Sequence, residues 1–289
     1  MGENDGILFI AYGDKCLREA SKAMSSVKKN SPGIPVAVIT DGEWCETQTP
    51  DYLIQKKNYT TDVKFSRKMK TECIYEESPF QRTLFLDTDV YVAKDIKLLF
   101  GLLDYYDFGA KFYGPFAKMK YPDKNSFFHL RCQSGVILFK KNDKNKKLFT
   151  LYKRYYAEAQ QNSNKEGLLL DEPFLTKALI GSDVKTVHLG ESLNFHLPVP
   201  TSVCNPIYIF HGRDENIETI AEEINGKWKD PINDVMSRVW LPEIKGFLPR
   251  GLKRLDALTA AALSLRRILN IYRRRWKGRA KKYYHKEDK

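Results

Sequence analysis

Two aspartates, one residue apart, interrupt an apolar run in the first half of the chain. Asp87 and Asp89 lie within LFLDTDVYV, residues 84–92. An unpaired carboxylate in a buried strand is costly, so this pair implies a compensating partner, most simply a divalent cation. At strand spacing the two side chains share one face, with Cα atoms roughly 6.6 Å apart. Such oxygen ligands favour Mg²⁺ or Mn²⁺. A solvated acidic turn gives the same spacing, but the flanking apolar strands favour the metal site.

The surrounding sequence predicts an α/β fold that would place this pair at a sheet edge. Residues 6–11 and 35–40 are continuous apolar runs, typical of strands covered on both faces, and residues 14–30 between them have helical spacing. This unit predicts a right-handed crossover and a parallel strand pair. Further strands are expected at 52–55, 83–86, 90–92, 108–112, 134–139, 184–187 and 206–210, and helices at 67–77, 95–106, 148–161 and 168–180.

These elements predict a Rossmann-like, mixed and mainly parallel sheet flanked by helices. Asp87 and Asp89 then follow the carboxyl end of a strand, where open α/β sheets bind ligands. Residues 114–131 are irregular and contain Pro and Tyr, as substrate-binding loops often do.

Composition separates a nearly neutral domain from a basic tail. The chain has 289 residues and a formal net charge of +12. Residues 250–289 hold 14 Lys and Arg against three acidic residues, a net of +11, which leaves +1 for residues 1–249. The net positive charge lies in the tail and therefore gives no information about the ligands of the main domain. Five scattered cysteines without a C-x-x-C pair indicate neither a zinc site nor a disulfide framework.

Several segments together resemble the GT-A glycosyltransferases, particularly the glycogenin and lipopolysaccharide galactosyltransferase-like branch. The resemblance covers roughly residues 6–213 and rests on the N-terminal strand–helix–strand unit, LFLDTDVYV, SGVILF, LLLDEPFL and FHGR. It implies a GT-A fold and an enzyme that moves a sugar from a nucleotide-sugar donor, usually linked to UDP, to a glycan or lipid-linked acceptor. It also implies that Asp87, Asp89 and His211 bind Mn²⁺, or Mg²⁺, beside the donor diphosphate.

The resemblance further assigns donor-binding residues. It places Ala11 and Tyr12 beside the base and ribose, and Arg67 or Lys68 at the donor phosphates or sugar. Thr88 and Gly212 are expected at the donor because they belong to the D-x-D and His211-Gly212-Arg213 motifs. Ser134 and Gly135 are expected to line the sugar site. At the level of sequence, Tyr12 could equally be a packed surface aromatic, and Ser134 and Gly135 could simply begin a tightly packed strand. For Arg67 and Lys68 a solvated helix face is the default interpretation.

The chain departs from the family pattern at positions that concern the sugar, the acceptor and the segment after His211. Gln133 and Glu172 stand where the family usually has Asn and Gln, and the pattern after His211 is reduced to His211-Gly212-Arg213. Arg213 is a candidate for a substitute cation that would stabilise the leaving diphosphate. Asp171 and Glu172 are candidates for the carboxylate base that an inverting enzyme requires, although Asp171 is equally suited to an N-cap. His211 could instead end its strand without a metal. The resemblance favours retention.

Two other classes remain open. A haloacid dehalogenase-type phosphatase also has D-x-D after an apolar strand, but that motif is usually near the N-terminus and has Thr or Val where this chain has Tyr91. Hydrolysis of a simple phosphomonoester would favour it. A non-catalytic, membrane-tethered nucleotide-sugar-binding scaffold would bind the donor without turnover.

Residues 250–289 predict a basic amphipathic helix. Apolar residues recur at steps of three and four between clusters of arginine, with aromatic residues among them. This pattern favours an anionic membrane surface over a docking helix or nucleic-acid binding. The N-terminus has no signal-peptide pattern. We therefore expect a cytoplasmic protein, peripheral on the inner face of a membrane, that does not bind nucleic acid.

Overall fold

The computed structural model describes residues 4–44, 48–57, 66–113, 131–161, 170–203, 205–226, 238–242 and 245–248. The predicted tail, 250–289, and most of the predicted loop at 114–131 lie outside them. The helices are α1 (Asp14–Asn30), α2 (Ser66–Cys73), α3 (Asp143–Gln161), α4 (Glu172–Ile180) and α5 (Ile217–Gly226), with 3₁₀ helices η2 (Lys97–Asp104) and η4 (Glu191–Leu193). None of the described helices is long and apolar enough to cross a membrane.

A seven-stranded sheet forms the centre of the fold, with the strand order β3-β2-β1-β4-β7-β6-β8. Its strands are β1 (Asp5–Ile10), β2 (Val36–Thr40), β3 (Tyr52–Gln55), β4 (Arg82–Leu86), β6 (Phe108–Tyr113), β7 (Arg131–Lys140) and β8 (Thr186–His188). Four of its neighbouring pairs are parallel, and β7 runs antiparallel between β4 and β6. The expected mixed, mainly parallel α/β sheet is confirmed.

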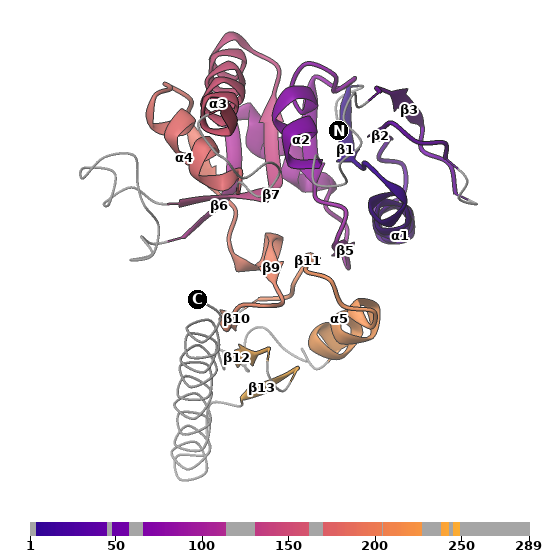
Figure 1. The fold of residues 1–289 in the computed structure, drawn as a ribbon. Coiled ribbons are helices and arrows are strands. Elements are labelled where there is room, and N and C mark those ends of the chain that lie inside the picture. The colour runs from indigo at the N-terminus through magenta and orange to yellow at the C-terminus, as the bar shows by residue number, and fades with distance from the viewer. Residues whose placement is uncertain are drawn as a thin grey trace, which may run out of the picture.

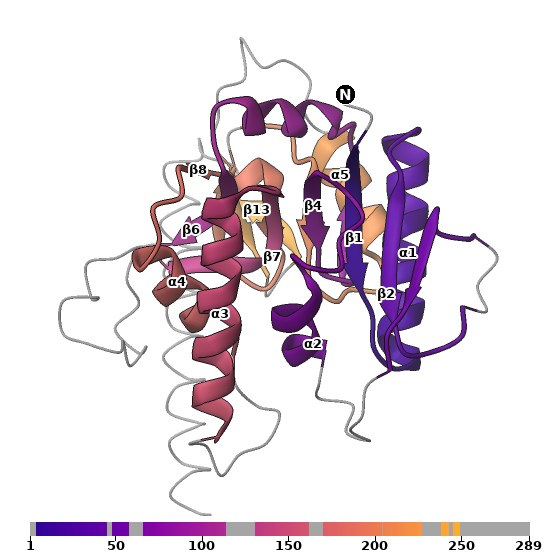
Figure 2. The ribbon, with the colours of Figure 1, turned by 90° about the horizontal axis from the view of Figure 1, so that it is seen from above.

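Both faces of this sheet are covered, as the continuous apolar runs predict. In β1, Ile7 and Phe9 pack against α1 and η2, whereas Leu8 and Ile10 point to the opposite face and pack with α2, α3 and α4. Figure 2 shows α1 beside β1 and β2, with α3 next to α4 across the molecule. Each face therefore has its own hydrophobic core. The two cores hold the sheet from both sides, and the candidate site lies at one edge of it.

Two smaller sheets complete the described fold. One has the order β5-β11-β9 and the other β10-β12-β13; their strands are β5 (Val90–Val92), β9 (Phe195–His196), β10 (Thr201–Val203), β11 (Ile209–His211), β12 (Arg238–Leu241) and β13 (Gly246–Leu248). In Figure 1 they lie below the main sheet with α5. Because β11 pairs with β5, the end of the domain lies next to the D-x-D motif.

Some predicted elements have different limits in the structure. The helix expected at 95–106 is the shorter 3₁₀ helix η2, and α2 ends at Cys73 rather than at residue 77. The strand expected at 206–210 is β11, which includes His211. The sequence did not predict α5, β9, β10, β12 or β13. Strands of two to four residues are too short to show a period of two that differs from chance.

Candidate functional site

The two aspartates are held by main-chain hydrogen bonds from two other strands. Asp87 follows the last residue of β4, and its main-chain N–H donates to the Gly135 carbonyl at 2.8 Å. The Asp89 carbonyl accepts from the main-chain N–H of Gly212 at 2.9 Å. Because β7 is antiparallel to β4, its beginning rather than its end meets this edge of the sheet. The motif is thus fixed between β7 and β11.

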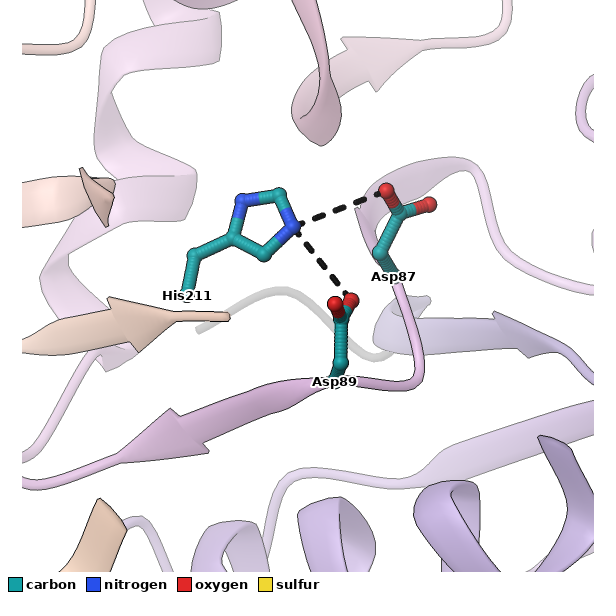
Figure 3. A group of neighbouring side chains, drawn as sticks. All are labelled: Asp87, Asp89 and His211. Atoms are coloured by element: carbon teal, nitrogen blue, oxygen red, sulfur yellow. Dashed lines mark ion pairs between the residues drawn. The ribbon is translucent and has the colours of Figure 1, made fainter. Parts of the chain in front are cut away.

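His211 completes a cluster that can hold a metal ion. Its Nε2 lies 3.3 Å from Asp89 Oδ1 and 3.7 Å from Asp87 Oδ2, and one ligand atom from each of the three residues lies within 4.8 Å of the others. Figure 3 shows the imidazole directed at both carboxylates. The antiparallel pairing of β11 with β5 sets His211 opposite Val90, and so beside Asp89. The three residues that the family resemblance grouped as ligands therefore lie together.

Gly135 leaves the space that this cluster occupies. A Cβ at this position would lie 2.2 Å from His211 Cε1 and 2.8 Å from Asp87 Oδ2. No side chain larger than hydrogen fits there without moving a ligand. The resemblance assigned Gly135 to the sugar site, and the structure places it directly against two of the three candidate metal ligands, His211 and Asp87.

The donor set fits a hard divalent cation. Two carboxylates with one imidazole suit Mn²⁺, and Mg²⁺ would rely on the carboxylates. Burial raises the pKa of Asp87, although Lys70 and His211 oppose that effect. Burial also disfavours the charged form of Asp89, but its hydrogen bond with His211 and the charges of His211 and Arg213 outweigh it and set its pKa to about 2. A cation would therefore meet at least one carboxylate that is ionised at neutral pH.

A buried ion pair lies beside this cluster. Lys70 Nζ, on α2, is 2.6 Å from Asp171 Oδ2 and 3.5 Å from Asp87 Oδ1, and it also donates to Ser134 Oγ at 3.1 Å. The Tyr152 hydroxyl donates to Asp171 Oδ2 at 2.8 Å. Burial favours the neutral form of each partner, but their mutual attraction raises the pKa of Lys70 and lowers that of Asp171. This arrangement leaves a cation next to the proposed metal ligands.

Asp171 occupies the N-cap position of α4, yet its side chain makes no capping hydrogen bond. Its carboxylate is directed to Lys70 instead. The N-cap explanation that the sequence left open therefore does not account for this side chain. Its neighbour Glu172 forms an ion pair with Arg131 at the beginning of β7.

Arg213 lies on the opposite side of Asp89 and is joined to the motif through Glu19. Arg213 Nε donates to Glu19 Oε1 at 2.8 Å, and one of its terminal nitrogens is 3.9 Å from Asp89 Oδ2. Thr88 donates its hydroxyl hydrogen to the other Glu19 oxygen at 3.1 Å. The Arg213 side chain is 57% exposed. Its exposed side chain can therefore reach an anionic ligand from solvent, although Glu19 itself is only 18% exposed.

The remaining predicted residues are less directly placed at the cluster. Ala11 and Tyr12 follow β1 and are buried, and the Tyr12 hydroxyl donates to the Lys56 carbonyl at 3.0 Å. Arg67 is exposed on the first turn of α2, and Lys68 is half-buried. Their predicted roles at the donor remain predictions. Gly212 has a φ of +140°, which favours glycine, and its N–H fixes Asp89.

Lys70 and Glu19 are charged residues of this site that the sequence did not reveal. Arg67, Lys68 and Lys70 share four residues of one helix, and only packing shows which of them is turned inward. Met69, Lys70, Thr71 and Cys73 are the buried positions among the described side chains of α2. A basic residue between buried positions at helical spacing was the signal that could have identified Lys70.

The comparisons with known proteins found distant structural neighbours and no match in sequence. No family model matches the chain. No curated protein matches it in sequence. Mouse xyloside xylosyltransferase 1 in its apo form has 13% identity over 72% of this chain and 98% of its own, with a TM-score of 0.46.

Two further solved structures are similar. For the glycosyltransferase GlyE of Streptococcus pneumoniae the identity is 14% over 81% of this chain, which spans only 62% of GlyE, with a TM-score of 0.49. For the galactosyltransferase LgtC, solved with donor and acceptor sugar analogues, the identity is 16% over 73% of this chain and 87% of LgtC, with a TM-score of 0.47. These neighbours are glycosyltransferases, the class that the sequence resembles. The likeness is distant, so the chemistry must be derived from the site itself.

Proposed function

We propose that this protein is a metal-dependent glycosyltransferase that transfers a sugar from a UDP-sugar to a glycan or lipid-linked acceptor with retention of configuration. The observation that carries the proposal is the cluster of Asp87, Asp89 and His211 at the carboxyl end of β4. Three residues from two distant parts of the sequence offer oxygen and nitrogen ligands, with the cations Lys70 and Arg213 on either side.

These charges suit the departure of a diphosphate. When bound, the Mn²⁺ ion supplies Lewis-acid stabilisation to the phosphate oxygens. Arg213 is exposed, and its ion pairs among the described residues are with the carboxylates of Glu19 and Asp89, so it can exchange Glu19 for an oxygen of the leaving group. Lys70 is fixed by Asp171 and Ser134 and contributes a positive potential without moving. Positioned charges of this kind stabilise a transition state because they need no reorganisation.

The state of Asp171 supports retention. A general base in an inverting enzyme must accept a proton from the acceptor, which favours a raised pKa. Burial alone would raise the pKa of Asp171, but the charge and hydrogen bond of Lys70 and the hydrogen bonds of Tyr152 and Ser134 lower it. Glu172 is paired with Arg131. Both candidate bases already hold cationic partners, so neither is prepared to take a proton.

The ion pair between Lys70 and Asp171 also suits sugar hydroxyls. A carboxylate accepts hydrogen bonds and an ammonium group donates them, and both lie beside the metal ligands where the transferred sugar would be. The location on a membrane surface through residues 250–289 belongs to the same proposal and rests on the basic amphipathic pattern of that segment.

The decisive test is Mn²⁺-dependent release of UDP from a panel of UDP-sugars, with Asp89→Asn compared with Asp95→Asn. Asp95 is the control because it is an exposed aspartate close to Asp89 in the sequence, and the substitution is chemically the same. We expect Asp89→Asn to abolish release and Asp95→Asn to retain it. Undiminished release by Asp89→Asn would refute the metal site, and phosphomonoester hydrolysis without sugar transfer would favour a phosphatase.

A further inference from the structure

Two buried amides lie behind His211, on the side of the ring away from the carboxylates. Gln133 belongs to β7, and Asn194 directly precedes β9. Asn194 is fully buried and Gln133 nearly so. His211 Nδ1 lies 3.1 Å from Asn194 Oδ1 and 3.3 Å from Gln133 Nε2. The ring nitrogen that does not face the carboxylates is therefore in contact with one amide oxygen and one amide nitrogen.

The orientation of both amides follows from a main-chain group. The N–H of Gly135 points at Gln133 at 2.8 Å, and because a main-chain N–H can only donate, the Gln133 atom that meets it must be Oε1. The same Oε1 is 2.6 Å from the Asn194 amide, which therefore presents Nδ2 to Gln133. The other atom of that amide, Oδ1, then faces His211. No choice of amide orientation remains once Gly135 is fixed.

We propose that Asn194, held by Gln133, is a positioning residue that keeps a hydrogen on His211 Nδ1, the tautomer required when a metal replaces the contact between Nε2 and Asp89. A neutral imidazole carries one hydrogen, and a metal on Nε2 requires that hydrogen on Nδ1. Asn194 Oδ1 is an acceptor placed at hydrogen-bond distance for it. The inference rests on the metal site of the proposed function.

The second contact at Nδ1 makes Asn194 necessary. Gln133 Nε2 is a donor, and by itself it would favour an Nδ1 without hydrogen. The hydrogen of the ring would then lie on Nε2, the atom that points at Asp87 and Asp89. Without Asn194 Oδ1, the neighbourhood of His211 thus stabilises the tautomer that cannot ligate.

The same network uses the hydrogen-bonding capacity of Gln133 Oε1, at the position where the family has an Asn that lines the sugar site. Its Oε1 already accepts two hydrogen bonds, from Gly135 and from Asn194. A carbonyl oxygen has two lone pairs, so both are used. Gln133 Oε1 therefore has no lone pair left for a sugar hydroxyl, and Gln133 contacts His211 both through Asn194 and through its own Nε2.

The test is a Mn²⁺ titration of the full chain by calorimetry, with Asn194→Ala, Asn194→Asp and the control Asn145→Ala. Asn145 is also a fully buried asparagine with two main-chain acceptors, but it binds the Asp107 and Lys140 carbonyls at the start of α3. We expect Asn194→Ala to raise the Kd for Mn²⁺ about 10- to 100-fold. Asn194→Asp should bind Mn²⁺ more tightly than Asn194→Ala but more weakly than wild type, because a carboxylate still accepts the Nδ1 hydrogen but cannot donate to Gln133 Oε1. Asn145→Ala should leave the Kd unchanged.

The outcomes separate this inference from the proposed function. Wild-type affinity in Asn194→Ala, or an Asn194→Asp variant as weak as Asn194→Ala, would overturn the role of Asn194 while leaving the metal site intact. Failure of the wild-type chain to bind Mn²⁺ would instead overturn metal dependence itself.

A second measurement needs no variant. With Co²⁺ in the wild-type chain and ¹⁵N-labelled histidine, the His211 Nδ1 hydrogen should give a cobalt-shifted proton resonance that is coupled to nitrogen and disappears in D₂O. Because His211 and Asn194 are buried, exchange should be slow enough to observe it. Absence of that resonance in the Co²⁺-loaded protein would overturn the inference.

Discussion

Replacement of Gly135 by alanine should damage the metal site through a single added methyl group. The Cβ would lie 2.2 Å from His211 Cε1, 2.8 Å from Asp87 Oδ2 and 2.9 Å from Gln133 Nε2. Carbon atoms in contact are separated by about 3.5 Å, so the imidazole would have to retreat by about 1.3 Å. Metal ligands tolerate displacements of only about 0.2 Å from their ideal distances. The clash is therefore several times larger than the site can absorb.

The expected magnitude follows from that displacement. His211 cannot move aside without breaking its contact with Asn194, so we expect the Kd for Mn²⁺ to rise by at least about 10- to 100-fold. Overpacking should also lower the free energy of unfolding by about 1–3 kcal/mol. Calorimetric titration with Mn²⁺ measures the first effect, and urea unfolding measures the second.

Gly109→Ala is the matched control. Gly109 lies in β6 of the same sheet, and its added Cβ would meet Val187, Leu189 and Leu138 at 3.1–3.4 Å, all through side-chain atoms outside the metal cluster. This variant should lose stability while keeping its affinity for Mn²⁺. If Gly135→Ala bound Mn²⁺ as tightly as wild type, the packing of His211 and Asp87 against Gly135 described above would be refuted.

Three further changes test other parts of the structure. Lys70→Met should lower the free energy of unfolding by about 3–5 kcal/mol, because it leaves Asp171 as a buried charge without its cation; in urea unfolding, the double variant Lys70→Met/Asp171→Leu should be more stable than Lys70→Met, and an equal loss in both would contradict the ion-pair explanation. Burial opposes ionisation of Asp107, but its hydrogen bonds from Lys185 and other donors lower its pKa. The ionised carboxylate therefore stabilises the fold fully at pH values above its unfolded pKa of about 3.9, and this contribution is lost as the pH falls through the lower pKa of the folded state. Asp107→Asn should therefore lower the free energy of unfolding by about 1.5–3 kcal/mol at pH 7. In acid-unfolding curves, the difference in stability between wild type and this variant should become smaller below about pH 4. A stability difference that does not change with pH would show that the charge of Asp107 is not its source. The full chain should sediment with anionic vesicles but not with neutral ones, and deletion of residues 250–289 should abolish that sedimentation. If the truncated chain sedimented with anionic vesicles as well as the full chain does, a membrane role for that segment would be unsupported.

Much of the central sheet could be predicted from short-range patterns. The apolar runs at 6–11 and 35–40 correspond to β1 and β2, which pair in parallel as expected. Burial on both faces leaves a continuous apolar run, and that signal is contained in a few consecutive residues. The short strands β9 and β12 offered no such signal, because their pairing is set by β11 and β10.

The metal cluster was accessible to sequence reasoning only in part. Asp87 and Asp89 were visible because charges in an apolar strand need a partner. His211 was added by resemblance to a family, since 122 positions separate it from Asp89 in the numbering. The structure brings it to the motif through the pairing of β11 with β5.

The sequence by itself determined that a covered, mainly parallel sheet would end in two carboxylates. Only the tertiary structure decided what surrounds them: Lys70 rather than Arg67 or Lys68 as the inward cation, and Asn194 behind His211. The physical reason is range. Strand and helix periodicity is written in neighbouring residues, whereas the ion pair and the imidazole contact depend on how separate elements pack against one another.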